Sequence, residues 1–133
     1  MNKFWMLTIA ALVLIACGQD KAKIKELDNK AIEVHDAVMP KMGDIIRLKG
    51  ELKAKMESVA DSMEAYQSLE AAFNQLLEAE QGMKDWMHQY QMPDYKKSMD
   101  ELLPLAEEQL SSIEKVKEQM ESSIAHASNL LAD

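Results

Sequence analysis

The sequence predicts an all-α protein, folded as an elongated antiparallel bundle of three helices. Glycine and proline are scarce, with four and three in 133 residues, whereas the helix-favouring residues Ala, Glu, Lys, Leu, Met and Gln are abundant. Apolar residues recur at steps of three and four along three long segments, which is the spacing of one face of a helix. No alternating run of β-branched and polar residues is present, so no sheet is expected.

The first expected helix covers residues 20–57 and carries a single apolar stripe. Pro40 lies inside this segment, where proline lacks an N–H donor and clashes with the preceding turn. We therefore expect the helix to be kinked there, or split, in which case the bundle has four helices. The stripe consists of Ile24, Leu27, Ala31, Val34, Val38, Met42, Ile45, Leu52 and Met56.

Two further helices are expected over residues 61–91 and 94–131. The second starts at Asp61 to Glu64, which have the spacing of a capping box, and ends before Pro93, because proline restricts the residue that precedes it. Pro104 can bend the third. Short turns make such helices pack antiparallel in sequence order, as in a coiled coil. Their apolar positions are Leu69, Phe73, Leu76, Met83, Met87 and Tyr90, followed by Tyr95, Met99, Leu102, Ala106, Leu110, Ile113, Met120 and Ile124.

The first sixteen residues differ in character from the rest of the chain. Lys3 gives a positively charged start, and the run from Phe4 to Ala16 is apolar except for Thr8. This run is shorter than the about 20 apolar residues that cross a bilayer, and it fits the central region of a secretory signal peptide. A single-span anchor or a buried helix is the alternative interpretation. The only cysteine of the chain, Cys17, follows directly.

The segment Leu14-Ile15-Ala16-Cys17 resembles the lipobox of bacterial lipoproteins, with an aliphatic residue three before the cysteine and a small residue just before it. The resemblance implies that residues 1–16 are removed and that Cys17 becomes the lipidated N-terminus of a helical-bundle domain over residues 17–133. Acyl chains such as palmitate would then hold the protein on a membrane. In some Gram-negative lipoproteins an Asp after the cysteine favours retention in the inner membrane. Gly18 stands at that position here, so the resemblance implies the outer membrane, at its periplasmic face or the cell surface.

Two short motifs in the remaining chain resemble small helical lipoproteins of Bacteroidota-type envelopes. They are His35-Asp36 with Met39-Pro40, and Trp86-Met87-His88. This resemblance covers a small part of the chain and implies no activity.

The expected mature chain is strongly acidic, with 14 basic and 23 acidic side chains in 117 residues. A polyanion of this kind is a poor partner for nucleic acid. Metalloprotease, redox Cys-x-x-Cys, phosphate-loop and Ser/His/Asp motifs are absent from the sequence, so we expect no enzymatic activity. The leading hypothesis is a non-catalytic binding or scaffolding role in the cell envelope, with a membrane anchor and an envelope protein as partners.

If Glu57 faces Ser62 across the first turn and Gln91 faces Asp94 across the second, methionines from all three expected helices lie at one level of the bundle, together with a histidine and a tryptophan. Imidazole and thioether groups form a soft ligand set that selects Cu(I), and an indole face can add a cation–π interaction. The second hypothesis is therefore a Cu(I) or other soft-metal site. Its expected ligands are His35, Met39, Met42, Met83, Met87 and Met99, with Trp86 beside them.

The same methionines also fit two other interpretations. Methionine fills irregular gaps in helical cores and packs well on aromatic rings, so the cluster can be ordinary core. It can also form a methionine-rich groove for a protein partner. The sequence leaves all three alternatives open.

Overall fold

The computed structural model describes the backbone of residues 3–132 and the side chains of residues 18–132. Within this part of the chain all regular structure is helical, which confirms the predicted all-α bundle. The helices are α1 (Lys3–Val38), α2 (Lys41–Ser58), α3 (Met63–Gln89) and α4 (Met99–Ala132). The predicted signal peptide of residues 1–16 and the lipidation at Cys17 lie outside the described side chains.

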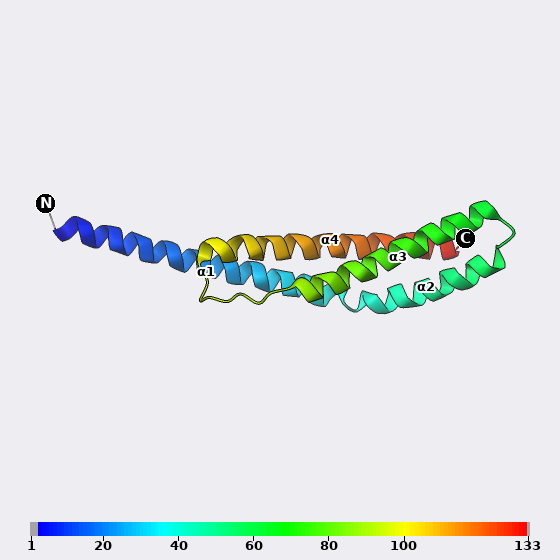
Figure 1. Ribbon diagram of the computed structural model, residues 1–133, viewed down its shortest axis with the longest axis horizontal. Coiled ribbons are helices and arrows are strands. Elements are labelled where there is room, and N and C mark those ends of the chain that lie inside the picture. The colour runs from blue at the N-terminus through cyan, green and yellow to red at the C-terminus, as the bar shows by residue number, and fades with distance from the viewer. Residues whose placement is uncertain (1–2, 133) are drawn as a thin grey trace.

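The first predicted helix is divided at Pro40, so that α1 and α2 form one bent arm. A short turn joins them, in which the backbone N–H of Met42 donates to the carbonyl of Met39 at 3.1 Å. Helices α1 and α2 run in one direction, α3 returns, and α4 runs parallel to α1, giving an elongated molecule (Figure 1). None of the helices in the described region combines the length and the apolar character of a membrane span.

Both ends of α3 differ from the prediction. Ser62 is the N-cap and makes no capping hydrogen bond through its side chain, so the predicted capping box at Asp61 to Glu64 is wrong. The turn is closed by the backbone instead, because the N–H of Ser62 donates to the carbonyl of Val59 at 2.9 Å. At the other end, an irregular segment of residues 90–98 replaces the predicted turn around Pro93.

The main core runs along the bundle and takes residues from all four helices. Small residues on α3, including Ala72 and Ala79, are buried in this core. At Gly82, an added Cβ would lie 3.3 Å from the Oε1 atom of Gln119 on α4. The buried members are Ala31, Val38, Ile45, Leu48, Leu52, Leu69, Ala72, Leu76, Ala79, Met83, Trp86, Ile113, Met120 and Ala127.

A second, smaller core lies between α1 and α4 near the N-terminal end of the bundle. It consists of Ile24, Leu27, Leu102 and Ala106, with Met99 packed against it. Helix α3 has already ended at this level, and the segment 90–98 runs alongside α1 in its place (Figure 1). The bundle therefore has two helices and an irregular segment at this end.

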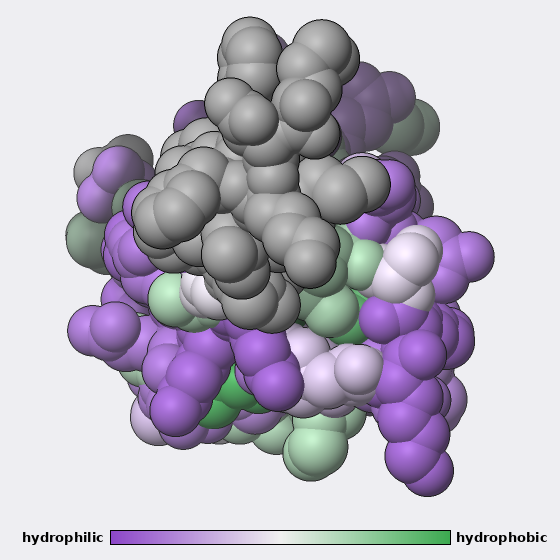
Figure 2. All heavy atoms as spheres, turned by 90° about the vertical axis from the view of Figure 1, so that its left-hand side faces the viewer, coloured by the Kyte–Doolittle hydropathy of each residue, from purple (hydrophilic) through white to green (hydrophobic). Residues whose placement is uncertain are grey.

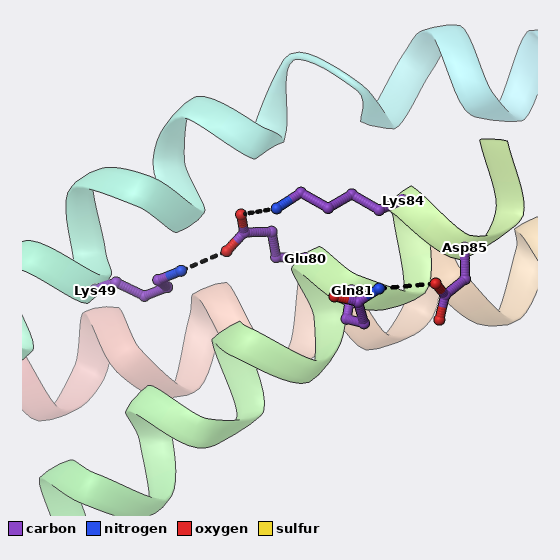
Figure 3. Close-up of polar contacts among 5 residues, drawn as sticks. All are labelled: Lys49, Glu80, Gln81, Lys84 and Asp85. Atoms are coloured by element: carbon purple, nitrogen blue, oxygen red, sulfur yellow. Dashed lines mark hydrogen bonds and ion pairs between the residues drawn. The ribbon is translucent and has the colours of Figure 1, made fainter. Parts of the chain in front are cut away.

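A half-buried ion-pair network ties α2 to α3 (Figure 3). Lys49 of α2 and Lys84 of α3 both donate to the carboxylate of Glu80, whose side chain is only 12 % exposed. The hydrogen bond from Lys49, followed by the one from Lys84, lowers the pKa of Glu80 below its ordinary value. The carboxylate therefore stays ionised and paired at neutral pH.

The burial of α3 predicts a large loss of stability for one of two neighbouring leucines and almost none for the other. Leu76 is fully buried, whereas Leu77 is 46 % exposed. We expect Leu76→Ala to lower the free energy of unfolding by about 2–5 kcal/mol, because it leaves a cavity in a packed core. The matched control Leu77→Ala should change it by less than about 0.5 kcal/mol. Urea titrations followed by circular dichroism measure both values, and equal losses would contradict the described packing.

Candidate functional site

Three aromatic rings form a cluster where α3 ends against α1 and α4. Trp86, in the last turn of α3, is only 6 % exposed. The ring of His35 on α1 stacks on its indole with centroids 5.4 Å apart, and the ring of Tyr90 lies 5.1 Å away. The indole N–H donates to the backbone carbonyl of Gln109 on α4 at 3.0 Å. We refer to His35, Trp86 and Tyr90 as the aromatic cluster.

Tyr90 links the end of α3 to α1. Its hydroxyl donates to the carboxylate of Asp28 at 2.8 Å. Burial raises the pKa of Tyr90 to about 12, and the hydrogen bond to Asp28 acts in the same direction. The phenol is therefore neutral at physiological pH and holds the two helices together as a hydrogen-bond donor.

Gln109 fixes the start of the irregular segment 90–98. Its side chain accepts a hydrogen bond from the backbone N–H of Gln91 at 2.6 Å and donates to the carbonyl of the same residue at 3.2 Å. These bonds satisfy the backbone N–H and C=O groups of Gln91, which lies beyond the end of helix α3. This role was not predicted from the sequence, although a glutamine at helical spacing between Ala106 and Ile113 interrupts an otherwise apolar stripe there.

The imidazole of His35 has an unusual environment. Its Nδ1–H donates to the carboxylate of Asp36 at 2.9 Å, which is the only direction available, because an ionised carboxylate can only accept. The other ring nitrogen, Nε2, then presents a lone pair. Within the described side chains, this Nε2 is buried and has no hydrogen-bond partner. A lone pair of this kind is a competent metal ligand.

The structure places part of the predicted methionine set in the main core, to which Trp86 also belongs. Met83 is fully buried in the main core, and Met39 and Met42 are half-buried against the same core. Met87 is 38 % exposed. Met99 packs on the second core instead, so the prediction that it lies level with His35 is wrong.

The reason for this difference is the length of the connection before α4. The predicted register between the first and second expected helices holds, because His35 lies against Trp86. The predicted register between the second and third assumed a tight turn, whereas segment 90–98 runs on past the end of α3 and shifts α4 along the bundle. Gln109 therefore lies level with Trp86, and Met99 lies about 15 Å from that level at 1.5 Å per residue.

Harder metal ions have no equivalent ligand group. Among the described residues, no three His, Cys, Asp or Glu side chains are grouped to hold a metal ion. A surface hollow does open beside the aromatic cluster, between Trp86 and Tyr90 on one side and Leu105, Glu108 and Ser112 on the other. The site therefore offers a buried imidazole nitrogen beside an indole inside and a mixed polar and apolar surface outside.

Comparison of the chain with known protein families, with curated proteins and with solved structures gives no match. The role of the aromatic cluster therefore has to be inferred from its own chemistry and from its place in the bundle.

The raised pKa of Tyr90 predicts a specific loss of stability in alkaline solution. Its pKa is about 12 in the folded protein, against an ordinary value of 10.0, so the unfolded chain loses the proton first as the pH rises. The stabilisation from Tyr90 is then fully present below about pH 10 and is lost as the pH rises through about 12. Urea titrations across this range should show that wild type loses its advantage over Tyr90→Phe above about pH 10.

Asp28→Asn serves as the control for this experiment. Burial is the larger cause of the raised pKa, so this variant should keep most of the alkaline loss of stability. Parallel pH dependences for wild type and Tyr90→Phe would show that the phenol is not held in the described environment.

Proposed function

We propose that the protein is a lipid-anchored, non-catalytic protein of the cell envelope, at the periplasmic face or the outer surface of the outer membrane, with a binding or scaffolding role. The lipobox resemblance at Cys17 supports the anchor. The observation that carries the scaffolding role is the continuity of the chain, because Gly18 already belongs to helix α1. The acylated residue would therefore be joined to the bundle without a flexible linker.

This continuity sets the distance by which the bundle would extend from the membrane. Helices α1 and α2 run in the same direction from Gly18 to Ser58, which is about 60 Å at 1.5 Å per residue. The turn between α2 and α3 and the C-terminal end of α4 lie together at the far end of the bundle (Figure 1). A lipid at Cys17 would hold this far end at a defined height above the bilayer.

The far end has surface features suited to a protein partner. Met63 is 70 % exposed there. Beside it, a surface hollow is lined by apolar side chains that include Val59, Leu69 and Leu130. An exposed apolar residue next to a hollow, surrounded by a polar rim, has the composition of a protein-binding surface.

The anchor is tested by labelling cells with a fatty acid that carries a chemical tag. Wild-type protein should carry the label and sediment with membranes, whereas Cys17→Ser should be unlabelled and leave the membrane fraction. Gly18→Ala is the matched control, because an added Cβ there meets no other atom within 4 Å, and it should behave as wild type. Unlabelled wild-type protein would contradict the proposed anchor.

The binding role is tested at the far end of the bundle. A photo-crosslinking residue in place of Met63 should form a defined protein adduct in intact cells that is lost in the Cys17→Ser background. The same residue at Lys117, on the exposed face of α4, provides the control position. Equal adducts at the two positions would speak against a specific surface at the far end.

A second candidate function, Cu(I) binding, is favoured by the unpartnered Nε2 of His35. This atom lies beside the indole of Trp86, and Asp36 holds the other ring nitrogen, in the manner of the carboxylates that orient metal-bound histidines. The thioethers of Met39, Met42 and Met83 pack in the same core region. Nitrogen, sulfur and an aromatic face form a soft environment suited to Cu(I).

Competition with a Cu(I) chelator, under reductant and without oxygen, tests this candidate. His35→Ala should weaken binding by about tenfold or more, because even changes outside the ligand set cost 10–100-fold in metal sites. Met83→Leu should also weaken binding while nearly conserving side-chain volume. Binding should weaken in acid, where the imidazole is protonated, and Zn(II) should compete poorly.

Met56→Leu is the matched control, because Met56 packs against the same core but follows Lys55, whose ammonium group donates to the carbonyl of Leu130 at the far end of the bundle. It should bind Cu(I) as wild type does. Equal affinities for wild type, Met83→Leu and Met56→Leu would identify these methionines as core packing alone.

A further inference from the structure

One surface of the bundle lies directly beside the proposed lipidation site. Residues 18–25 of α1 and the irregular segment that precedes α4 meet there (Figure 1). The ammonium group of Lys21 lies 5.0 Å from the centre of the Tyr95 ring. Both residues line a surface hollow, together with Gly18 and Lys25 of α1 and with Met92 and Pro93 of the irregular segment. We refer to residues 18–25 and 91–98 as the anchor-end surface.

This surface exposes apolar side chains that the fold does not use. Met92 is 79 % exposed, the largest value among the exposed large hydrophobic residues, and Tyr95 is 39 % exposed. The segment that carries them is held at its start by the two hydrogen bonds between Gln109 and Gln91. The apolar side chains are therefore presented by a fixed piece of backbone.

The charge of the anchor-end surface is opposite to that of the rest of the chain, and two acids border it: Glu26, which pairs with Lys23 at 3.9 Å, and Asp28, which lines the same hollow. The anchor-end surface contains five lysines and two aspartates, a net charge of +3. The rest of the expected mature chain has nine basic and 21 acidic side chains, a net charge of −12. Figure 2, which looks onto this end, shows hydrophilic side chains around a smaller apolar area. The lysines are Lys21, Lys23, Lys25, Lys96 and Lys97.

The position of Lys21 along α1 gives the depth of Lys21, and of the Tyr95 ring beside it, relative to a lipid on Cys17. Lys21 lies one turn after Cys17, about 6 Å along the helix axis. The headgroup region of one leaflet is about 5–8 Å thick. With the acyl chains of Cys17 in the bilayer, Lys21 and Tyr95 would lie at the depth of the headgroups. Tyrosine is enriched at this depth, and lysine places its stem on apolar groups and its ammonium group among phosphates.

We propose that the anchor-end surface seats on the headgroups of an anionic phospholipid bilayer and holds the bundle upright. The inference rests on the proposed lipidation of Cys17. Lysines near a membrane are attracted to anionic headgroups, whereas the acidic remainder of the bundle is repelled from them. Attraction at one end and repulsion along the body orient the long axis away from the membrane.

A spin-label experiment on the lipidated mature protein tests the proposal. The only native cysteine carries the lipid, so Met92→Cys and Met63→Cys each provide a single free thiol for a nitroxide label. The proteins are placed in vesicles of phosphatidylethanolamine and phosphatidylglycerol, and collisions of the label with oxygen and with a water-soluble nickel complex are compared. The label at residue 92 should show a severalfold higher ratio of oxygen to nickel collisions than the label at residue 63.

Charge variants then test the role of the lysines. Lys96→Glu with Lys97→Glu should lower the collision ratio at residue 92 toward that at residue 63. The control pair Lys115→Glu with Lys117→Glu, on α4 and outside the anchor-end surface, should leave it unchanged. Replacing phosphatidylglycerol by a zwitterionic lipid should lower the collision ratio at residue 92 in the same way as Lys96→Glu with Lys97→Glu. Equal effects of the two pairs would overturn the proposed charge recognition.

The outcomes separate this inference from the proposed anchor. Protein that fails to float with the vesicles would overturn both, because the lipid itself would be missing. Protein that floats while the label at residue 92 stays as accessible to the nickel complex as the label at residue 63 would overturn the seated orientation alone. In that case the anchor stands, and the exposed apolar side chains would be free for a protein partner.

Discussion

Helix α4 is the element on which the rest of the structure depends, because it packs against each of the other three helices. Its buried stripe includes Leu102 and Ala106 near one end and Met120 and Ala127 near the other. The first pair belongs to the small core with α1, and the second belongs to the main core. Without α4, helix α1 would lose the element that covers its apolar face, because α3 ends before that level.

The junction around Trp86 shows how the bundle changes from three helices to two. Where α3 stops, the indole N–H of Trp86 and the backbone N–H of Gln91 both donate to Gln109. The hydroxyl of Tyr90 donates to Asp28. A helix end inside a packed structure needs such partners for its free backbone groups. The Nε2 atom of His35 is the exception within the described region, and an unpaired buried polar atom points to a ligand or to a cost in stability.

The two ends of the bundle are chemically different, and the proposals follow from that difference. One end combines lysines with exposed apolar residues beside the candidate acylation site. The far end has an exposed methionine beside an apolar hollow, at the greatest distance from Cys17. Under the proposed function, an acidic body between an end proposed to face the membrane and an end proposed to bind a partner would hold that partner at a fixed height.

The sequence by itself determined the all-α class, the bend at Pro40 and most of the buried positions, because helical periodicity and the restrictions of proline act over a few residues. It also placed His35 beside Trp86, since a short turn between α2 and α3 sets that register. Only the tertiary structure decided the course of segment 90–98, and with it the displacement of Met99 and the roles of Tyr90 and Gln109. That segment is held by hydrogen bonds to residues far along the chain. Gln109 does interrupt an apolar stripe, but no local pattern in the sequence identifies the residue that it binds.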